Sequence, residues 1–244
     1  SDLNQYLDLM ERVSTEGHMD SMTLADSFGV CTPQGISMVV SKLRERFNQP
    51  IEIHCHEDFG LGVANTIAAL AAGASVAHVT VSATGERAGN VPLEDTVMAL
   101  RVLYGVDTGV KTEGLYDLSK LVQKLSGISV APNRPIVGDS LYNIESGIVA
   151  MFHRRCKDVE PLEYIPFLPE LVGRPMVDVA LGKGSGLANI EEHLERRGLK
   201  ATSEQANEIL AQVKQVSIDT KRLLSEDEFN QIAKSVLQGT TDSV

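Results

Sequence analysis

This 244-residue chain has 43% hydrophobic and 23% charged residues, a composition typical of a folded globular protein. Its formal net charge of −11 argues against a nucleic-acid or anionic-membrane surface, because both need clustered lysine and arginine. No apolar run approaches the ~20 residues that a membrane-spanning helix requires. Three cysteines without a CxxC pair (Cys31, Cys55 and Cys156) favour a reduced, cytoplasmic protein over a disulfide-stabilised one.

The first part of the chain is predicted to alternate helices and strands. The apolar spacing indicates helices at 3–16, 34–47 and 61–73, and strands at 21–26, 51–55 and 75–82. Strands that alternate with helices of this length indicate right-handed β-α-β units, and hence a parallel sheet or barrel. Each strand runs into a polar or glycine-rich loop. Since chemistry in such folds lies at the carboxyl ends of the strands, we expect the three loops to face one pocket.

The pattern changes at about residue 112. Helical "LYDLSKLVQKLSG" leads into proline-rich "VAPNRPIVGDS", a short helix, the glycine loop "LGKGSG" and a helical end. We interpret 1–111 as part of an α/β domain and 112–244 as a linker with a small, mainly helical subdomain. The "LGKGSG" loop lacks the full spacing of a phosphate-binding P-loop, so we interpret it as a tight turn.

The segment "IEIHCHEDFG" (51–60) carries the candidate metal site. Side chains alternate along a strand, so His54 and His56 share one face and Cys55 points to the other. Two imidazoles can converge on one ion that takes further carboxylate, amide or water ligands. The alternative is a pair of hydrogen-bonded histidines at a strand end. The loop after the next strand, "GERAGN", adds Glu86, Arg87 and Asn90.

Two acids follow the histidines and have different expected roles. Glu57 comes directly after His56, so alternation predicts that it faces away from the metal. Asp58 is expected to orient a loop or to cap the helix that starts near Leu61.

Three spaced segments resemble a known family. "ADSFGVCTP", "IHCHEDFGLGVANTIAALAAGA" and "SATGERAGNVPLEDTVMAL" are similar to the sixth, seventh and eighth strand regions of the divalent-metal TIM-barrel family of isopropylmalate, homocitrate and citramalate synthases. Hydroxymethylglutaryl-CoA lyase and 4-hydroxy-2-oxovalerate aldolases are relatives. "APNRPIVGDSLYNIESGI" and "VGRPMVDVALGKGSG" resemble the synthases' subdomain more weakly. The resemblance implies an α/β fold: the last three β-α units of a TIM (β/α)8 barrel, followed by a small helical subdomain.

The resemblance also implies roles for individual residues. His54 and His56 would be ligands of a divalent metal (Mg, Mn or Zn), with Asn90 at or near it. Ser27 matches a hydroxyl position that contacts the 2-oxo acid, although it could equally cap a turn. Arg87 is a candidate for substrate binding. Glu86 is a catalytic candidate, and the absence of a cysteine from its loop favours a synthase over a lyase.

One departure affects the acid–base machinery. The synthases carry "ESGIH", whose histidine reaches the active site of the neighbouring subunit, whereas this chain has Val149 at that position. His153 lies one helical turn further on and could substitute, since residues i and i+4 share a helix face. Tyr164 matches the tyrosine that acts with that histidine. The alternatives are a surface histidine and an aromatic residue that packs on the linker.

The resemblance implies an enzyme of amino-acid biosynthesis that condenses acetyl-CoA with a 2-oxo acid at the metal. A retro-aldol or Claisen lyase is the alternative that Val149 would favour, and a non-catalytic assembly half-barrel is another. Relatives are dimers with exchanged subdomains, so we expect a homodimer. An intact barrel has five earlier strands, the first with an aspartate ligand, so we expect that half in a longer polypeptide or a separate chain.

Overall fold

The computed structural model describes residues 2–174 and 177–239. The chain forms two compact units, the first ending at Gly138 and the second starting at Asp139. The first unit extends past residue 111 because the helix after the expected boundary packs on it, with Ser119 Oγ 2.6 Å from Ser82 Oγ. No helix in the described part is long and apolar enough to cross a membrane.

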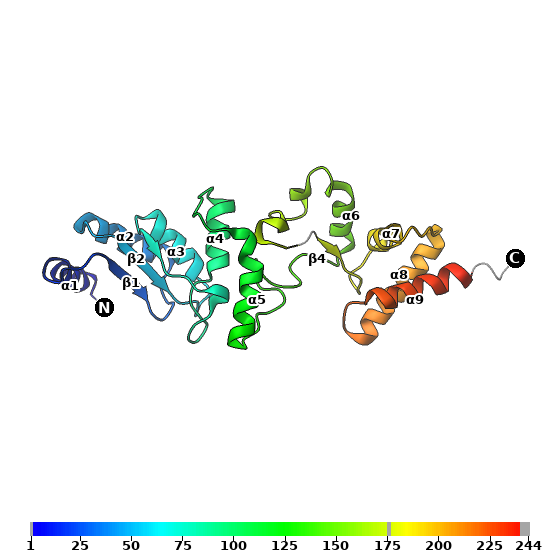
Figure 1. Cartoon of the computed structure of the whole chain (residues 1–244), viewed down its shortest axis with the longest axis horizontal. Coiled ribbons are helices and arrows are strands. Elements are labelled where there is room, and N and C mark those ends of the chain that lie inside the picture. The colour runs from blue at the N-terminus through cyan, green and yellow to red at the C-terminus, as the bar shows by residue number, and fades with distance from the viewer. Residues whose placement is uncertain (1, 175–176, 240–244) are drawn as a thin grey trace. The chain divides into compact units, whose positions relative to one another are not determined.

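The first unit is a parallel α/β structure, as predicted. Its elements are α1 (Leu3–Glu16), β1 (Met22–Asp26), α2 (Pro33–Arg46), β2 (Ile51–Cys55), α3 (Gly62–Ala71), β3 (Val76–Ala77), the 3-10 turn η1 (Val81–Ala83), α4 (Leu93–Leu103), η2 (Thr112–Gly114) and α5 (Leu115–Ser126). The strands form one sheet in the order β1-β2-β3, with parallel pairing throughout. Figure 1 shows α2 and α3 beside β2. A parallel sheet of three strands is compatible with part of a barrel, and the described residues of this unit do not form a closed barrel.

Strand β2 separates a buried face from a half-buried one. Ile51, Ile53 and Cys55 are fully buried in the core, together with Val40 and Leu43 of α2. The residues between them, including His54, point to the other face, which is half-buried. The alternation predicted for Cys55 is therefore observed. Apolar contact on one face fixes the strand's register, and so fixes where the polar side chains point.

The third strand is shorter than the predicted 75–82. It pairs with β2 only at Val76 and Ala77. Ser82 and Ala83 then adopt left-handed backbone angles (φ 56° and 58°), which no strand accommodates. Glu94 holds this turn, because its Oε2 accepts a hydrogen bond from the Ser82 amide at 3.0 Å.

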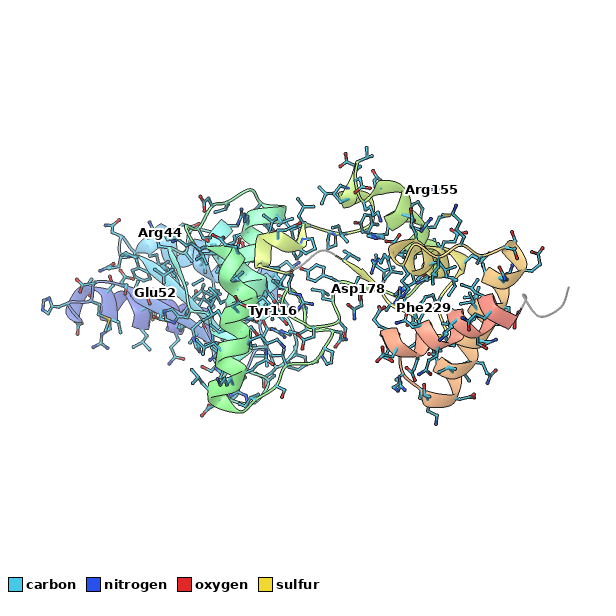
Figure 2. The ribbon with its side chains drawn as sticks, turned by 45° about the vertical axis from the view of Figure 1, so that its right-hand side comes forward. Arg44, Glu52, Tyr116, Arg155, Asp178 and Phe229 are labelled. Atoms are coloured by element: carbon cyan, nitrogen blue, oxygen red, sulfur yellow. The ribbon has the colours of Figure 1, made fainter. Side chains whose placement is uncertain are left out.

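The second unit is mainly helical. Its elements are β4 (Asn143–Ile144), α6 (Gly147–Cys156), η3 (Pro161–Glu163), η4 (Pro169–Val172), β5 (Asp178–Val179), α7 (Leu187–Arg196), α8 (Ser203–Thr220) and α9 (Glu226–Gly239). The parallel pair β4-β5 was not predicted. Ile190, Ile209 and Phe229 are fully buried where α7, α8 and α9 meet. Figure 2 labels Phe229 on α9. Thr202 begins α8 with a capping box shared with Gln205.

Candidate functional site

The carboxyl end of β2 brings three histidines together. The ring centroids of His54 and His56 lie 5.2 Å apart, with the ring planes at 76°. His78, which follows β3, lies 5.6 Å from His54 by the same measure. All three side chains are half-buried. The strand end thus presents the two imidazoles of the HxH motif on one face.

His56 and Asn90 form a backbone bridge, which brings the loop 84–90 against the end of β2. His56 Nδ1 and Asn90 Oδ1 are both buried and have no hydrogen-bond partner within the described residues. Buried polar atoms are normally paired, so two unpartnered atoms that can both ligate a metal indicate a site for a ligand. A Cβ on Gly85 would meet Asn90 Nδ2 at 2.6 Å, so only glycine admits this approach.

The charge state of His54 also suits a metal. Burial lowers the pKa of His54, and the neighbouring His56 and His78 lower it further. A lowered pKa keeps the imidazole neutral, which is the form that ligates. No group of three or more His, Cys, Asp or Glu side chains that could hold a metal occurs in residues 2–174 and 177–239. Imidazole and amide groups such as those of His54, His56 and Asn90 are of the kinds that ligate a divalent ion together with further ligands.

Arg87 ties three loops together. Its Nε and Nη2 donate to Asp58 Oδ1 and Oδ2 at 2.9 and 3.1 Å, and Nη2 also donates to the Ser27 carbonyl at 2.6 Å. The guanidinium lies 5.6 Å from the centroid of the Phe28 ring. The hydrogen bond from Arg87 is the main reason that the pKa of Asp58 is lowered. Asp58 thus orients a loop, the first of its two predicted roles.

Glu57 performs the capping role that was the other expectation for Asp58. Its carboxylate accepts hydrogen bonds from the amides of Gly62 and Val63, at 3.2 and 3.1 Å, at the start of α3. A carboxylate there pairs free amides and complements the helix dipole. This side chain is therefore used by α3, away from the histidines, as alternation predicted.

Two of the other candidates are not joined to the histidines by a contact. Glu86 is exposed, and its side chain makes no hydrogen bond or ion pair with any residue that the structure describes. Ser27 is exposed as well, and its backbone carbonyl accepts a hydrogen bond from Arg87. Whether either residue contacts a substrate remains a prediction.

Sequence reasoning missed Glu52 and His78. His78 Nε2 shares a 2.8 Å hydrogen bond with Glu52 Oε2, next to His54. Hydrogen bonds from Ser21 and then His78 lower the pKa of Glu52. The signal for Glu52 was present, because it precedes His54 by two positions and so shares its face. His78 was hidden, because its proximity depends on the pairing of β3 with β2.

His153 and Tyr164 meet in the second unit. Their ring centroids lie 5.1 Å apart with the planes at 84°. His153 is 3% exposed, so the alternative of a surface histidine is wrong. His153 Nδ1 and Tyr164 Oη are buried without a hydrogen-bond partner in the part that the structure describes. Burial lowers the pKa of His153 and raises that of Tyr164, so both side chains are neutral at pH 7.

Comparisons with known proteins identify curated relatives of this chain. The chain is 43% identical to an Archaeoglobus fulgidus protein named provisionally as an (R)-citramalate synthase, over 98% of this chain and 47% of that protein. It is 40% identical to the homocitrate synthase AksA of Methanothermobacter thermautotrophicus, over 89% of this chain and 54% of that protein. The chain thus spans about half the length of the curated relatives that it matches.

The structure of the hydroxymethylglutaryl-CoA lyase of Bacillus subtilis matches with a TM-score of 0.49 and 26% identity, over 53% of this chain and 45% of that chain. The model of the HMGL-like family matches residues 1–122, which include both histidines of the HxH motif and the "GERAGN" loop. The chain belongs to the HMGL-like family.

Proposed function

We propose that this chain supplies part of the active site of an acyltransferase that condenses acetyl-CoA, or another acyl-CoA, with a 2-oxo acid to give a 2-hydroxy dicarboxylic acid. The observation that carries the proposal is the meeting of His54, His56 and Asn90, with unpartnered His56 Nδ1 and Asn90 Oδ1, at the end of β2. The names of the relatives as citramalate, isopropylmalate and homocitrate synthases support this reaction type. The three free thiols support a cytoplasmic location.

His54, His56 and Asn90 would hold a divalent metal (Mg, Mn or Zn). Bound there, the metal would polarise the carbonyl of the 2-oxo acid as a Lewis acid. Arg87 would hold the Asn90 loop in place through Asp58. The Arg87 Nη1 makes no hydrogen bond with the described residues, so it is available to a substrate carboxylate.

Proton transfer would use His153 and Tyr164. Both side chains are neutral and buried, and each has an unpartnered polar atom. A neutral imidazole can accept a proton from the methyl carbon of the acyl-CoA, and the enolate so formed would attack the carbonyl carbon of the 2-oxo acid. Water would then hydrolyse the thioester of the adduct, giving the dicarboxylic acid and coenzyme A as the free thiol. We propose that the second unit acts as a subdomain that delivers this pair to the site of a partner in a homodimer. The remaining barrel half would lie in the same polypeptide or in a separate chain.

A lyase remains the second candidate because of one feature of the sequence. Val149 stands where the synthases that this chain resembles have a histidine. The loop 82–90 has no cysteine, which disfavours the lyase that uses one there. Full-length protein incubated with hydroxymethylglutaryl-CoA or a 4-hydroxy-2-oxo acid tests this candidate directly, and cleavage without any condensation activity would replace the synthase proposal.

The synthase proposal is tested with full-length protein, Mg or Mn, acetyl-CoA and a panel of 2-oxo acids, by measuring free thiol. Thiol release that depends on one 2-oxo acid is the expected result. His54→Ala and His56→Ala should abolish it, while His18→Gln, an exposed histidine of the same unit, should leave it unchanged. Absence of thiol release with every acceptor contradicts the synthase. Full activity of both alanine variants contradicts the site.

A further inference from the structure

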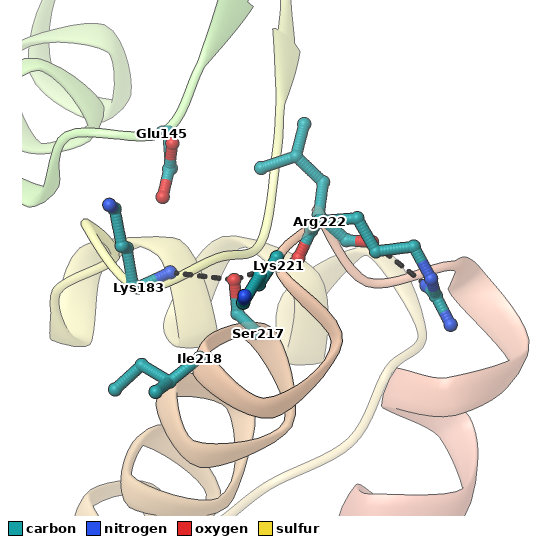
Figure 3. A pocket seen from close by; sticks show the side chains of 7 residues that line it. Glu145, Lys183, Ser217, Ile218, Lys221 and Arg222 are labelled. Carbon is teal, nitrogen blue, oxygen red and sulfur yellow. Dashed lines mark hydrogen bonds between the residues drawn. The ribbon is translucent and has the colours of Figure 1, made fainter.

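A pocket lies in the second unit. It has a volume of about 610 Å³ and is lined by Glu145, Lys183, Ser217, Ile218, Lys221, Arg222 and Leu223. Figure 3 shows Lys183 on the glycine loop 181–186 and Lys221 at the end of α8. Its volume falls within the ~300–1,000 Å³ that small-molecule sites occupy. The function proposed above assigns no role to this pocket.

The walls of this pocket are tied together by hydrogen bonds. Ser217 Oγ accepts from the Lys183 amide at 3.1 Å and donates to the Arg222 carbonyl at 2.8 Å. The Leu224 amide donates to the Leu181 carbonyl at 2.8 Å. Fully buried Asn189 donates to the carbonyls of Glu145 and Ala180. These hydrogen bonds fix the position of the glycine loop relative to the end of α8, so a ligand would bind to a preformed site.

The glycine loop also determines where the acid of this pocket lies. Glu145 Oε1 accepts a hydrogen bond from the Gly184 amide at 2.8 Å. A Cβ on Gly182 would meet the same oxygen at 2.5 Å, so the carboxylate can rest there only against glycine. The loop thus holds Glu145 through its own backbone rather than through Lys183.

The pocket has more positive charge than its own acids neutralise. Arg222 is paired, with its two terminal nitrogens 2.8 and 2.7 Å from the Glu228 carboxylate. Lys183 and Lys221 form no ion pair with any residue of 2–174 and 177–239. Two unpaired ammonium groups in one pocket are suited to an anion.

Lys221 also has a backbone conformation that lysine disfavours. Its φ of 55° is left-handed, at the C-cap of α8, where glycine is the usual residue. The left-handed conformation is unfavourable for a residue with a Cβ. A lysine charge near a helix C-terminus recovers part of that cost.

Ile218 and Leu223 add apolar surface beside the two lysines. They are 55% and 39% exposed, which leaves their side chains accessible. We propose that this pocket binds a small organic anion, whose carboxylate or phosphate head pairs with Lys183 and Lys221 while a short aliphatic part covers Ile218 and Leu223.

Two-dimensional NMR of the full chain tests the proposal with hexanoate, hexyl phosphate, inorganic phosphate and hexylammonium as probes. Hexanoate and hexyl phosphate should shift the amide signals of residues 182–184 and 217–223 saturably, and the tighter of the two identifies the preferred head group. Inorganic phosphate should bind more weakly, because it lacks the aliphatic part. Hexylammonium should not bind. Equal binding of hexylammonium and hexanoate would overturn the proposal.

The variants Lys183→Gln and Lys221→Gln should each weaken hexanoate or hexyl phosphate by about two- to fivefold, and the double variant by about tenfold or more. Lys234→Gln, at an exposed lysine of α9 outside the pocket, is the matched control and should bind like the parent. Lys221→Gly removes the ammonium but suits the left-handed backbone, so it should fold at least as stably while binding more weakly. Unchanged affinity in the double variant or in Lys221→Gly would show that the lysines are not the site.

Discussion

The first unit holds His54 and His56 half-buried at a strand end, whereas the second holds His153 and His193 in its interior, at 3% and 2% exposure. The two interior histidines differ from each other in their partners. His193 Nε2 is bonded to the Val179 carbonyl and Nδ1 to Arg197, so it joins α7 to β5. His153 Nδ1 has no partner among the described residues and faces Tyr164.

This difference shows which observation separates a structural histidine from a functional candidate. Burial does not, because His153 and His193 are equally buried. The hydrogen-bond partners do separate them. A buried polar atom without a hydrogen-bond partner destabilises the fold, so it persists only where another requirement outweighs that cost. By this criterion His56 and Asn90 in the first unit resemble His153 and Tyr164 in the second, and His193 belongs to the scaffold.

Removal of the HxH imidazoles should have the largest effect, because it takes away both proposed histidine ligands of the metal. The double variant His54→Ala, His56→Ala should lose more than about 100-fold in Mn²⁺ affinity, since even residues that only orient a ligand cost about 10- to 100-fold. Isothermal titration calorimetry measures this. His18→Gln is the control, and retention of the parent affinity by the double variant would refute the metal site.

Replacement of the two interior histidines tests whether their hydrogen-bond partners determine how much each contributes to stability. His193→Phe should lower the free energy of unfolding by about 1–3 kcal/mol, because it leaves the buried Val179 carbonyl without its partner. His153→Phe should change it by less than about 0.5 kcal/mol, because no hydrogen bond within the described part is lost. Urea denaturation compares the two variants. Equal losses of unfolding free energy in the two variants would mean that hydrogen-bond partners do not distinguish the roles of these two histidines.

Acid should destabilise the second unit through the same two histidines. Burial lowers the pKa of His153 and of His193, so the unfolded chain binds protons more readily than the folded one. Their stabilisation is complete above the unfolded value of about 6.5 and is lost as pH falls below it, by at most about 1.4 kcal/mol per pH unit for each histidine. Unfolding of the parent at pH 7.5 and 5.5, compared with His193→Phe, measures the contribution, and an unchanged slope would contradict it.

The smallest expected effect concerns how the first unit supports its histidines. Glu57→Ala should destabilise the protein by about 1 kcal/mol, because the amides of Gly62 and Val63 lose their acceptor. Glu57→Gln retains one acceptor oxygen and should lose less. Thermal unfolding ranks the two variants. A Glu57→Ala protein as stable as the parent would show that solvent replaces this cap without cost.

Several features of the fold followed from the sequence alone. Helix 3–16 is observed at the predicted residues, and the parallel order of three strands followed from their alternation with helices. The strand 75–82 was predicted too long, because alternation in "SVAHVTVS" does not reveal the left-handed turn at Ser82 and Ala83. That turn depends on Glu94, twelve residues further along the chain.

The features of the sites also differ in whether the sequence or only the tertiary structure revealed them. Alternation along a strand is a local property, so the sequence by itself determined that His54 and His56 share a face and that Cys55 lies in the core. Three other placements required the tertiary structure. His78 lies beside His54, and Lys183 and Lys221 line one pocket. Glu57 caps α3, a role that was one of the two expected for Asp58. These contacts join residues of different elements, and their geometry is set by how the elements pack rather than by any spacing within one of them.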